Sequence, residues 1–237
     1  MSTDIRTLLH QFTVFTEVPE ARYTQLTEAT ITLRFSKGDR IWEEGDNSKY
    51  LYFIVSGSVK IIKHSETGKD VIIEIFGPRD AIGVSAMLVS KPYITEAVCL
   101  SPVTALSIPS EIILELLGEV PGMALRSLKG MARRQRMLMQ KVKEMAGGGV
   151  EYRIAHLLLK LANRIGAAEA ENQISIPINL SRQDIADLVG TTVETAIRVM
   201  SRWRKLKIVD NDRTGLVILD RTSLENVAAG LTLDSDV

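Results

Sequence analysis

The sequence LSRQDIADLVGTTVETAIRVMSRWRKL, residues 180–206, contains two short amphipathic helices separated by a glycine. Ser181 is a residue that caps helices well, and Asp184 stands three positions later, where its carboxylate can bond back to the cap. Gly190 permits a sharp turn, and Thr191-Thr192 can cap the second helix. Two short helices joined by such a turn predict a helix-turn-helix.

The second helix of this pair has an apolar side and a polar side. The apolar side is expected to pack and comprises Ala196, Val199, Met200, Trp203 and Leu206. The opposite side presents Glu194, Ile197, Arg198, Ser201 and Arg202. A helix-turn-helix places its second helix in the major groove of DNA, where an arginine fork can bind guanine and a carboxylate can accept from cytosine. Glu194 and Arg198 are four residues apart, hence on one face, and are the expected base-reading pair.

Two other roles for this pair stay open at this point. Thr191-x-x-Glu194 is itself a capping-box pattern. Glu194 and Arg198 are also spaced for an ion pair along one helix. Five basic residues and no acidic one lie between Arg198 and Lys207, which fits contact with DNA phosphates but also a solvated helix face. The caps, the turn and the basic run taken together favour DNA reading.

Residues 30–109 read as short strands separated by turn residues. Gly38, Gly45, Gly57 and Gly68 fall between the strands, where a positive φ is often needed. Short strands at this spacing predict an antiparallel sandwich or barrel, and His64–Asp70 is expected to form a hairpin turn. The expected strands are TITLRF (30–35), RIWEEG (40–45), YLYFIVSG (50–57), SVKIIKH (58–64), VIIEIFG (71–77), EAVCL (96–100) and VTALSIP (103–109).

A long helical stretch follows, which Pro109-Ser110-Glu111 is expected to open. It carries a heptad pattern with one polar member, which is typical of a dimerising coiled coil; packing of the helix on its own domain is the alternative. Gly147-Gly148-Gly149 then provides a hinge. The seam begins at Ala124, and the expected dimer interface comprises Leu128, Met131, Gln135, Leu138, Val142 and Met145.

Beyond the hinge, residues 150–167 predict a second amphipathic helix. A loop rich in Ala, Glu and Asn is expected next, followed by a strand at residues 174–178. A final hairpin is expected at residues 210–219, with Gly215 in its turn. The expected domains are a sensor domain (1–121), a dimerisation helix (122–146) and a DNA-binding domain (147–237).

Composition limits the remaining classes of protein. Of the 237 residues 45% are apolar, and no run reaches the roughly 18–20 apolar residues that span a bilayer. Cys99 is the only cysteine, so one chain cannot form a disulfide or a four-cysteine cluster. No signal peptide is evident, so we expect a cytoplasmic protein with no membrane partner. The sequence has no phosphate-binding glycine loop, nucleophile elbow or metal-ligand spacing, and we do not expect an enzyme.

Two long segments resemble the CRP/FNR family, the family of the cyclic AMP receptor protein and the fumarate–nitrate regulator. GDRIWEEGDNSKYLYFIVSGSVKII (38–62) is similar to the sensor signature of that family, and LSRQDIADLVGTTVETAIRVMSRWRKLKIV (180–209) to its reading head. The resemblance implies an α+β protein with a β-roll (jelly-roll-like) sensor, a long dimerisation helix and a winged helix-turn-helix. It also implies a homodimeric regulator of transcription that binds double-stranded DNA and works with RNA polymerase.

The resemblance also assigns roles on the reading helix. Glu194 and Arg198 match the residues of the family that read the core of each half-site. Val193 matches the fumarate–nitrate branch, whereas Ile197 replaces a base-contacting serine of that branch. We therefore expect a palindromic site whose half-sites contain a TGA-like core, one helical turn apart. The expected DNA-contacting residues are Ser181, Arg182, Thr192, Val193, Glu194, Ile197, Arg198, Ser201 and Arg202.

The sensor lacks two signatures of its family. The cyclic AMP pattern needs Gly-Glu and Arg-Ser pairs, but here Val84 follows Gly83, and Ile94-Thr95 takes the second place. A cyclic phosphate without its arginine loses its strongest contact, so cyclic AMP is not expected. Cys99 alone cannot hold the iron–sulfur cluster of the other branch.

The identity of the effector stays open. Other branches of the family bind haem and sense a gas, or bind small acids; His10 and His64 are the haem-ligand candidates, and His156 is a weaker one. An anion could use basic residues of the dimerisation helix, such as Arg126. The other class of function that we keep is a ligand-binding signalling module that does not bind DNA. The candidate effector pocket comprises Gly83, Val84, Ser85, Ile94, Thr95, Arg133 and Arg134.

Overall fold

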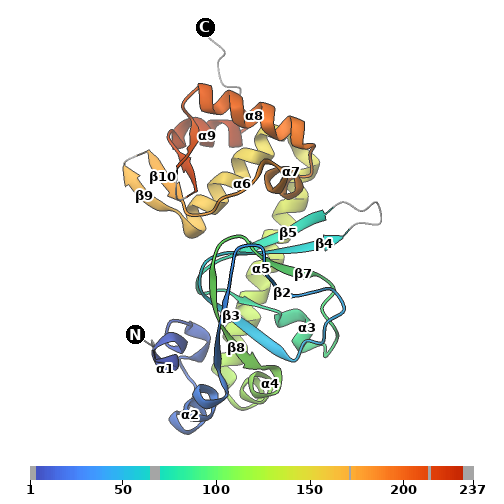
Figure 1. The fold of residues 1–237 in the computed structure, drawn as a ribbon, viewed down its shortest axis with the longest axis vertical. Helices are drawn as coiled ribbons and strands as arrows, with labels where there is room; N and C mark the ends of the chain where they lie inside the picture. Colours follow the sequence, from blue (N-terminus) through green and yellow to red (C-terminus); the bar gives the residue numbers. More distant parts are fainter. Residues whose placement is uncertain (1–3, 65–69, 171, 213–214, 232–237) are drawn as a thin grey trace. The chain divides into compact units, whose positions relative to one another are not determined.

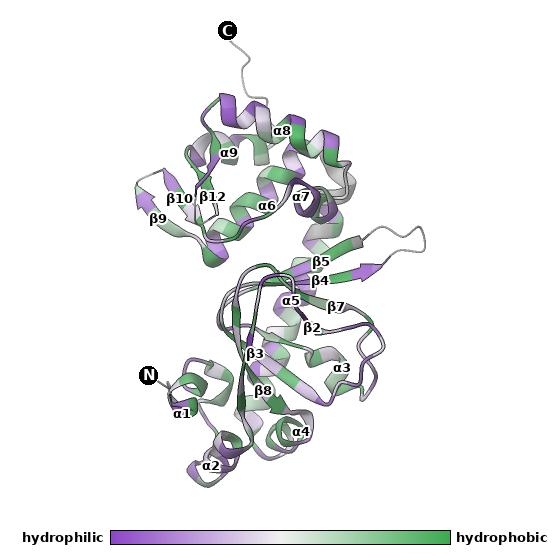
Figure 2. Ribbon diagram, viewed as in Figure 1, coloured by the Kyte–Doolittle hydropathy of each residue, from purple (hydrophilic) through white to green (hydrophobic). Residues whose placement is uncertain are grey.

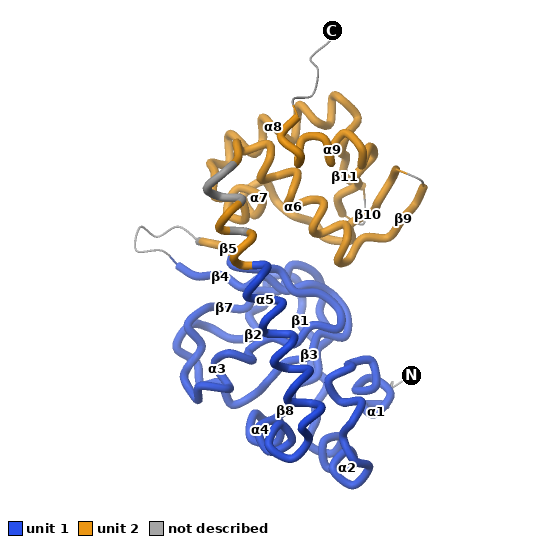
Figure 3. Tube along the Cα trace, turned by 180° about the vertical axis from the view of Figure 1, so that it is seen from behind, with its two compact units in different colours: residues 1–64, 73–137 blue, residues 65–72, 138–237 orange. Residues whose placement is uncertain are grey.

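A computed structural model describes residues 4–64, 70–170, 172–212 and 215–231. The chain divides into two compact units, residues 1–64 with 73–137 and residues 65–72 with 138–237 (Figure 3). Strand β5 (Asp70–Phe76) and helix α5 (Pro121–Gly147) contribute residues to both units. Gly68 and most of the expected turn at His64–Asp70 lie outside the described residues, as does the side chain of Met145.

The first unit is an antiparallel β-roll of two four-stranded sheets (Figure 1). One sheet has the order β1-β8-β3-β6, and the other has the order β2-β7-β4-β5. The seven strands that the sequence predicts are all present, together with a short β6 that it does not. The strands of the roll are β1 (Ile31–Phe35), β2 (Arg40–Trp42), β3 (Tyr50–Ser56), β4 (Val59–His64), β5, β6 (Ala81–Ile82), β7 (Glu96–Cys99) and β8 (Val103–Pro109).

Close approach of two turns explains one of the glycines between strands. Gly57 follows β3 with φ +84°, and a Cβ atom there would collide with the carbonyl oxygen of Pro102. Gly38 and Gly45 also have positive φ values, as expected, but open space surrounds them. Of these three glycines, only Gly57 is required both by its backbone conformation and by its packing.

Helices cover one sheet of the roll and form a second apolar layer with it. Leu9, Leu26 and Leu116 are fully buried in the cluster that these helices make with Phe53 and Leu106. The heptad stretch is one helix, α5, preceded by a separate α4, and it begins at Pro121, one residue before its expected start. The helical elements of the first unit are α1 (Ile5–Leu9), η1 (Thr13–Phe15), α2 (Glu20–Ala29), α3 (Val84–Leu88), α4 (Ser110–Glu119) and the first part of α5.

The second unit packs four helices with a small sheet of order β11-β12-β10-β9 (Figure 1). Helix α6 contacts α7, α8 and α9 and so forms the centre of this unit. The expected loop after α6 is wrong in part, because residues 167–170 pair with β10 as strand β9. The elements are α6 (Val150–Ile165), β9 (Ala167–Ala170), β10 (Gln173–Ile176), α7 (Arg182–Val189), α8 (Val193–Lys205), β11 (Val209–Asn211), β12 (Leu216–Ile218) and α9 (Arg221–Ala228).

The final hairpin, β11–β12, is confirmed and forms the wing beside the helix-turn-helix. The backbone N–H of Gly215 donates a hydrogen bond to the Asp212 carboxylate across the turn. A Cβ atom at Gly215 would collide with the carbonyl oxygen of Ile176 in β10. The α+β architecture therefore agrees with the sequence. Within the described residues no helix is both long and apolar enough to cross a membrane.

Candidate DNA interface and effector region

The first helix of the reading head is capped as the sequence predicts. The Ser181 hydroxyl accepts a hydrogen bond from the backbone N–H of Asp184 at 3.0 Å, and the Asp184 carboxylate accepts from the backbone N–H of Ser181 at 3.0 Å. Helix α7 ends at Gly190, which has φ +67°. A left-handed residue closes the helix and reverses the chain, and glycine adopts that conformation at low cost. This local chemistry fixes the turn between α7 and α8.

Thr192, not Thr191, caps the second helix. The Thr192 hydroxyl accepts from the backbone N–H of Thr195 at 3.3 Å, and Val193 is the first residue of α8. Glu194 is therefore the second residue of the helix and not the third member of a capping box headed by Thr191. The alternative capping role of Glu194 is thus wrong.

The apolar side of α8 forms the core of the reading head. Ala196 and Trp203 are fully buried, and Val199 and Met200 are nearly so. Figure 2 shows the alternation of hydrophobic and hydrophilic residues along this helix. The expected burial of Leu206 is wrong, because α8 ends at Lys205 and Leu206, the C-cap residue, is 50% exposed.

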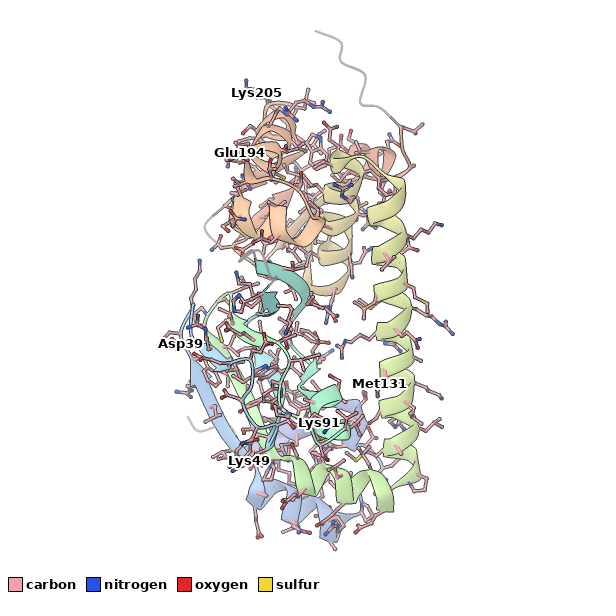
Figure 4. The ribbon with its side chains drawn as sticks, turned by 90° about the vertical axis from the view of Figure 1, so that its right-hand side faces the viewer. Asp39, Lys49, Lys91, Met131, Glu194 and Lys205 are labelled. Atoms are coloured by element: carbon pink, nitrogen blue, oxygen red, sulfur yellow. The ribbon has the colours of Figure 1, made fainter. Side chains whose placement is uncertain are left out.

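The opposite side of α8 is open and polar. Glu194 and Arg198 are both exposed, and Figure 4 marks Glu194 near the start of the helix and Lys205 near its end. Among the described residues none forms an ion pair with Arg198, so its guanidinium is available. Ile197 is 46% exposed on the same side, and Val193 is half-buried. The remaining predicted contact residues of this face are Thr192, Ser201 and Arg202, all exposed.

Two of the predicted DNA-contacting arginines are constrained within the unit, Arg202 by an ion pair and Arg182 by partial burial. Arg202 pairs with Glu151 of α6, with Nη2 2.6 Å from Oε2. Arg182 is half-buried, and its pKa is lowered, first by burial and then by the nearby charge of Arg204. Arg204 in turn pairs with Asp210 of the wing at 2.7 Å. These pairs hold α8 to its neighbours.

Arg153 ties the start of α6 to the turn of the reading head, a role that the sequence does not reveal. Its guanidinium donates to the carbonyl oxygens of Val189 at 2.8 Å, Gly148 at 2.8 Å and Gly190 at 3.5 Å. Gly148 lies in the expected hinge, and the other two carbonyls end α7. One side chain therefore satisfies helix-terminal carbonyls and holds the hinge backbone at the same time.

Helix α5 exposes the heptad seam. Leu128 is 62% and Val142 67% exposed, and the seam residues Met131, Gln135 and Leu138 are exposed too. Figure 4 marks Met131 in the middle of the helix. The inner side of α5 packs on its own unit through Met123, which is 1% exposed. Exposed apolar residues along a helix favour a partner on that face.

The interior of the roll is filled by its own aromatic side chains. Trp42 stacks on Tyr93 with 4.2 Å between ring centroids and on Tyr52 with 5.7 Å. The Tyr93 hydroxyl donates to the carbonyl oxygen of Tyr50 at 2.6 Å. Burial raises the pKa of Tyr93, and the Tyr93 ring also lies 3.3 Å from where a Cβ atom of Gly83 would stand. A planar apolar stack thus occupies the centre of the sensor.

A cyclic nucleotide does not fit these interior residues. Among the described residues of the first unit, the buried polar ones include no arginine or lysine. Ile94, at the expected arginine position, is 72% exposed, and Thr95 uses its carbonyl oxygen to accept from the Trp42 indole at 2.8 Å. Val84 and Ser85 begin the short helix α3. A phosphate buried here would lack a charged partner, so we derive no step through a cyclic nucleotide.

The two arginines of the candidate pocket differ. Arg134 lies against the roll, with Nε 3.2 Å from the Glu74 carboxylate and its guanidinium 4.4 Å from the centre of the Phe76 ring. Arg133, the preceding residue, is exposed. Arg126 pairs with Glu17. Of these cations only Arg133 lacks a described partner, so an anion at this junction would have to compete with Glu74 for Arg134.

The haem-ligand candidates lie outside the apolar interior. His10 stacks on Tyr23 at 4.8 Å, in the helical layer of the first unit. His64 lies 3.0 Å from the Glu96 carboxylate at the end of β4, and this contact, with help from Arg40, lowers the pKa of Glu96. His156 contacts the carbonyl oxygen of Ala228 at 3.0 Å in the second unit. These positions do not favour a haem site, because a ring nitrogen of His64 and of His156 already has a partner and His10 lies in the helical layer, outside the interior of the roll.

Comparison with known proteins identifies both units. Residues 32–119 match the family model of the cyclic nucleotide-binding domain, and residues 152–227 match the Crp-like helix-turn-helix domain. The chain belongs to the CRP/FNR family of transcription regulators. The regulator thus combines a cyclic-nucleotide-binding-like domain with a DNA-binding helix-turn-helix.

Known proteins are similar to this regulator over most of its length. The CRP-like cAMP-activated global transcriptional regulator of Mycobacterium tuberculosis is 27% identical over 188 residues, 79% of this chain and 84% of the relative. The global nitrogen regulator of Synechococcus elongatus is 25% identical over 193 residues, 81% of this chain and 86% of the relative. The solved structure of FixK2 from Bradyrhizobium japonicum has the same fold, with a TM-score of 0.72 at 22% identity, covering 83% of this chain and 96% of FixK2. Both of these sequence relatives carry the names of regulators, not of enzymes.

Proposed function

We propose that this regulator binds palindromic DNA as a homodimer and reads each half-site with Glu194 and Arg198. The open polar face of α8 carries this proposal, because its opposite face is completely committed to the core of the reading head. An exposed arginine beside an exposed glutamate offers a donor fork and an acceptor to neighbouring base edges. The caps at Ser181 and Thr192 hold that face in place.

The dimer is proposed to form through α5. Its exposed seam, from Leu128 to Val142, has the heptad spacing that two helices bury against each other. In a symmetric dimer the same residues of both copies meet. Two reading heads then address two half-sites on one side of the duplex, about 10 base pairs apart. At a promoter such a dimer is placed to contact RNA polymerase.

Control is proposed to come from a small effector or gas at the junction of the roll with α5. One relative is named as cAMP-activated and another as a global nitrogen regulator, so their names do not agree on one effector. Arg134, Glu74 and Phe76 already join α5 to the roll at this place. A ligand that binds better to one arrangement of this junction would shift the dimer between two states. The residues present favour an effector other than a cyclic nucleotide.

Selection from random duplex DNA tests the proposed function. The full chain should enrich a palindrome whose half-sites are one helical turn apart and contain a TGA-like core. Variant Arg198→Lys keeps the charge but loses the fork, so it should enrich a degenerate version of that core. A non-palindromic motif, or no motif, contradicts the proposal.

A further inference from the structure

Ile197 is the one strongly apolar and exposed side chain among the described residues of the reading face of α8. It is 46% exposed, although the helix buries Ala196, Val199, Met200 and Trp203. Glu194 lies three residues before it, and Ser201 lies four residues after it, so all three share a face. Val193, one turn earlier, lies on the same edge of that face and is half-buried. The face therefore has an apolar edge beside its polar centre.

Ile197 is not one of the buried core residues of the reading head. The core of the reading head is complete on the other side of α8, and solvent reaches about half of this side chain. Single exposed apolar residues are common and carry no function by themselves. Ile197 differs because exposed Glu194, Arg198 and Ser201 surround it, and these are side chains that suit base edges. A partner that covers Glu194 and Arg198 must therefore also cover Ile197.

We propose that Ile197 contacts the C5 methyl group of a thymine in each half-site. This inference rests on the proposed function, because it assumes that α8 lies in the major groove. Thymine is the only base that presents an apolar group there. Over adenine, guanine or cytosine, an isoleucine would cover a donor or acceptor without replacing its hydrogen bond with water, which costs free energy. The chemistry of Ile197 thus selects thymine beside the bases that Glu194 and Arg198 read.

Removing the thymine methyl group at one position at a time tests the proposed contact. Each thymine of the selected half-site is replaced in turn by deoxyuridine, on both arms of the palindrome, and the dissociation constant is measured by fluorescence anisotropy. One position should weaken binding about fourfold per half-site, the value of one buried methyl group, and the other positions should have little effect. Base pairing and charge are unchanged, so the difference reports only the methyl contact.

Protein variants test whether Ile197 is the side chain that contacts this methyl group. Ile197→Ala should weaken binding to the duplex that contains thymine at that position. In this variant the deoxyuridine substitution should have no further effect there, because the losses from removing two groups that contact each other do not add. Leu206→Ala is the matched control, since Leu206 is equally exposed at 50% but follows the end of α8; it should retain the full deoxyuridine effect. Fluorescence of the buried Trp203, read in a Trp42→Phe background, checks that both variants remain folded.

The outcomes separate this inference from the function on which it rests. Sequence-specific binding that no deoxyuridine weakens, or a deoxyuridine effect that persists in Ile197→Ala, overturns the thymine contact and leaves the proposed function standing. Binding with no preference over scrambled DNA overturns the proposed function, and the thymine contact with it.

Discussion

Helices α5 and α8 are both amphipathic and both basic, but α5 exposes its apolar face whereas α8 exposes its polar face. Helix α8 buries its apolar side in its own unit and exposes Glu194 and Arg198. Helix α5 exposes its apolar seam, from Leu128 to Val142, and packs on its own unit elsewhere. The chemistry that remains open on each helix indicates the partner: a polar face fits base edges, and an apolar heptad seam fits a second copy.

This comparison also explains why basic residues alone are a poor guide. Both helices carry many, but several are held in pairs, such as Arg202 with Glu151 and Arg134 with Glu74. Arg198 has no such pair among the described residues. The position of an arginine relative to its own carboxylates, not its presence in a basic run, decides whether it is available to DNA.

Leu128→Glu should have the largest effect, because it places a charge in the proposed seam of α5. Burying a leucine contributes about 1.5–3 kcal/mol, and the change occurs in both protomers, so dimerisation should weaken by about 4 kcal/mol or more. Sedimentation should show a folded monomer. Lys129→Glu adds the same acid one residue along, off the seam, and should leave the dimer intact. A dimer that survives Leu128→Glu unchanged contradicts the assignment of this face.

Arg198→Lys should weaken specific DNA binding by about 2 kcal/mol per half-site, because lysine cannot form the bidentate contact to guanine. Binding to a scrambled duplex should hardly change, since the charge is kept. Arg202→Lys makes the same change one turn later, where Glu151 already holds the side chain, and should cost much less specificity. Equal losses for the two variants would show that α8 does not read bases in this orientation.

Arg153→Gln should destabilise the reading unit by about 1.5 kcal/mol, the lower end of the usual range for hydrogen bonds from a charged group. Urea unfolding can be followed through Trp203 in a Trp42→Phe background, because the chain has only these two tryptophans. Lys160→Gln, at an exposed position of the same helix, is the control. If Arg153→Gln unfolds at the same urea concentration as the control, the carbonyl contacts contribute nothing to stability.

Acid should produce the smallest of these effects, and we predict it for Glu96 of the sensor unit. His64, and then Arg40, lower the pKa of Glu96 below its ordinary value of 4.5. The charged Glu96 side chain therefore stabilises the folded state above pH 4.5, and this stabilisation is lost as the pH falls through the lowered pKa. Glu96→Gln should therefore be less stable than the parent at pH 6, by less than about 1 kcal/mol, and this difference should shrink as the pH falls below 4.5. Thermal unfolding across this range checks it; a gap that widens in acid would reverse the assigned sign.

Local chemistry explains which parts of the structure the sequence could predict. The cap at Ser181 and the turn at Gly190 depend on residues within four positions of each other, and both are confirmed. Strand β9 was missed because Ala and Glu have weak strand preference, and only pairing with β10 makes them a strand. The three bonds of Arg153 were missed because two of their partners lie 36 and 37 residues away.

The two candidate sites also differ in how far the sequence could predict them. The reading face follows from helical spacing alone, so the predicted polar residues do share one exposed side of α8. The effector region depends on the packing of several strands, and spacing could not foresee that Tyr93 stacks on Trp42 or that Arg134 binds Glu74. The identity of the effector therefore stays a matter for experiment.

Binding of the full chain to its selected palindrome, compared with a scrambled duplex of the same composition, tests the central claim most directly. Fluorescence anisotropy at a series of salt concentrations measures both affinities. We predict that the palindrome binds at least about 1,000-fold more tightly and that both affinities fall steeply as salt rises. Equal affinity for the two duplexes, or binding that salt does not weaken, would contradict the conclusion that α8 reads DNA.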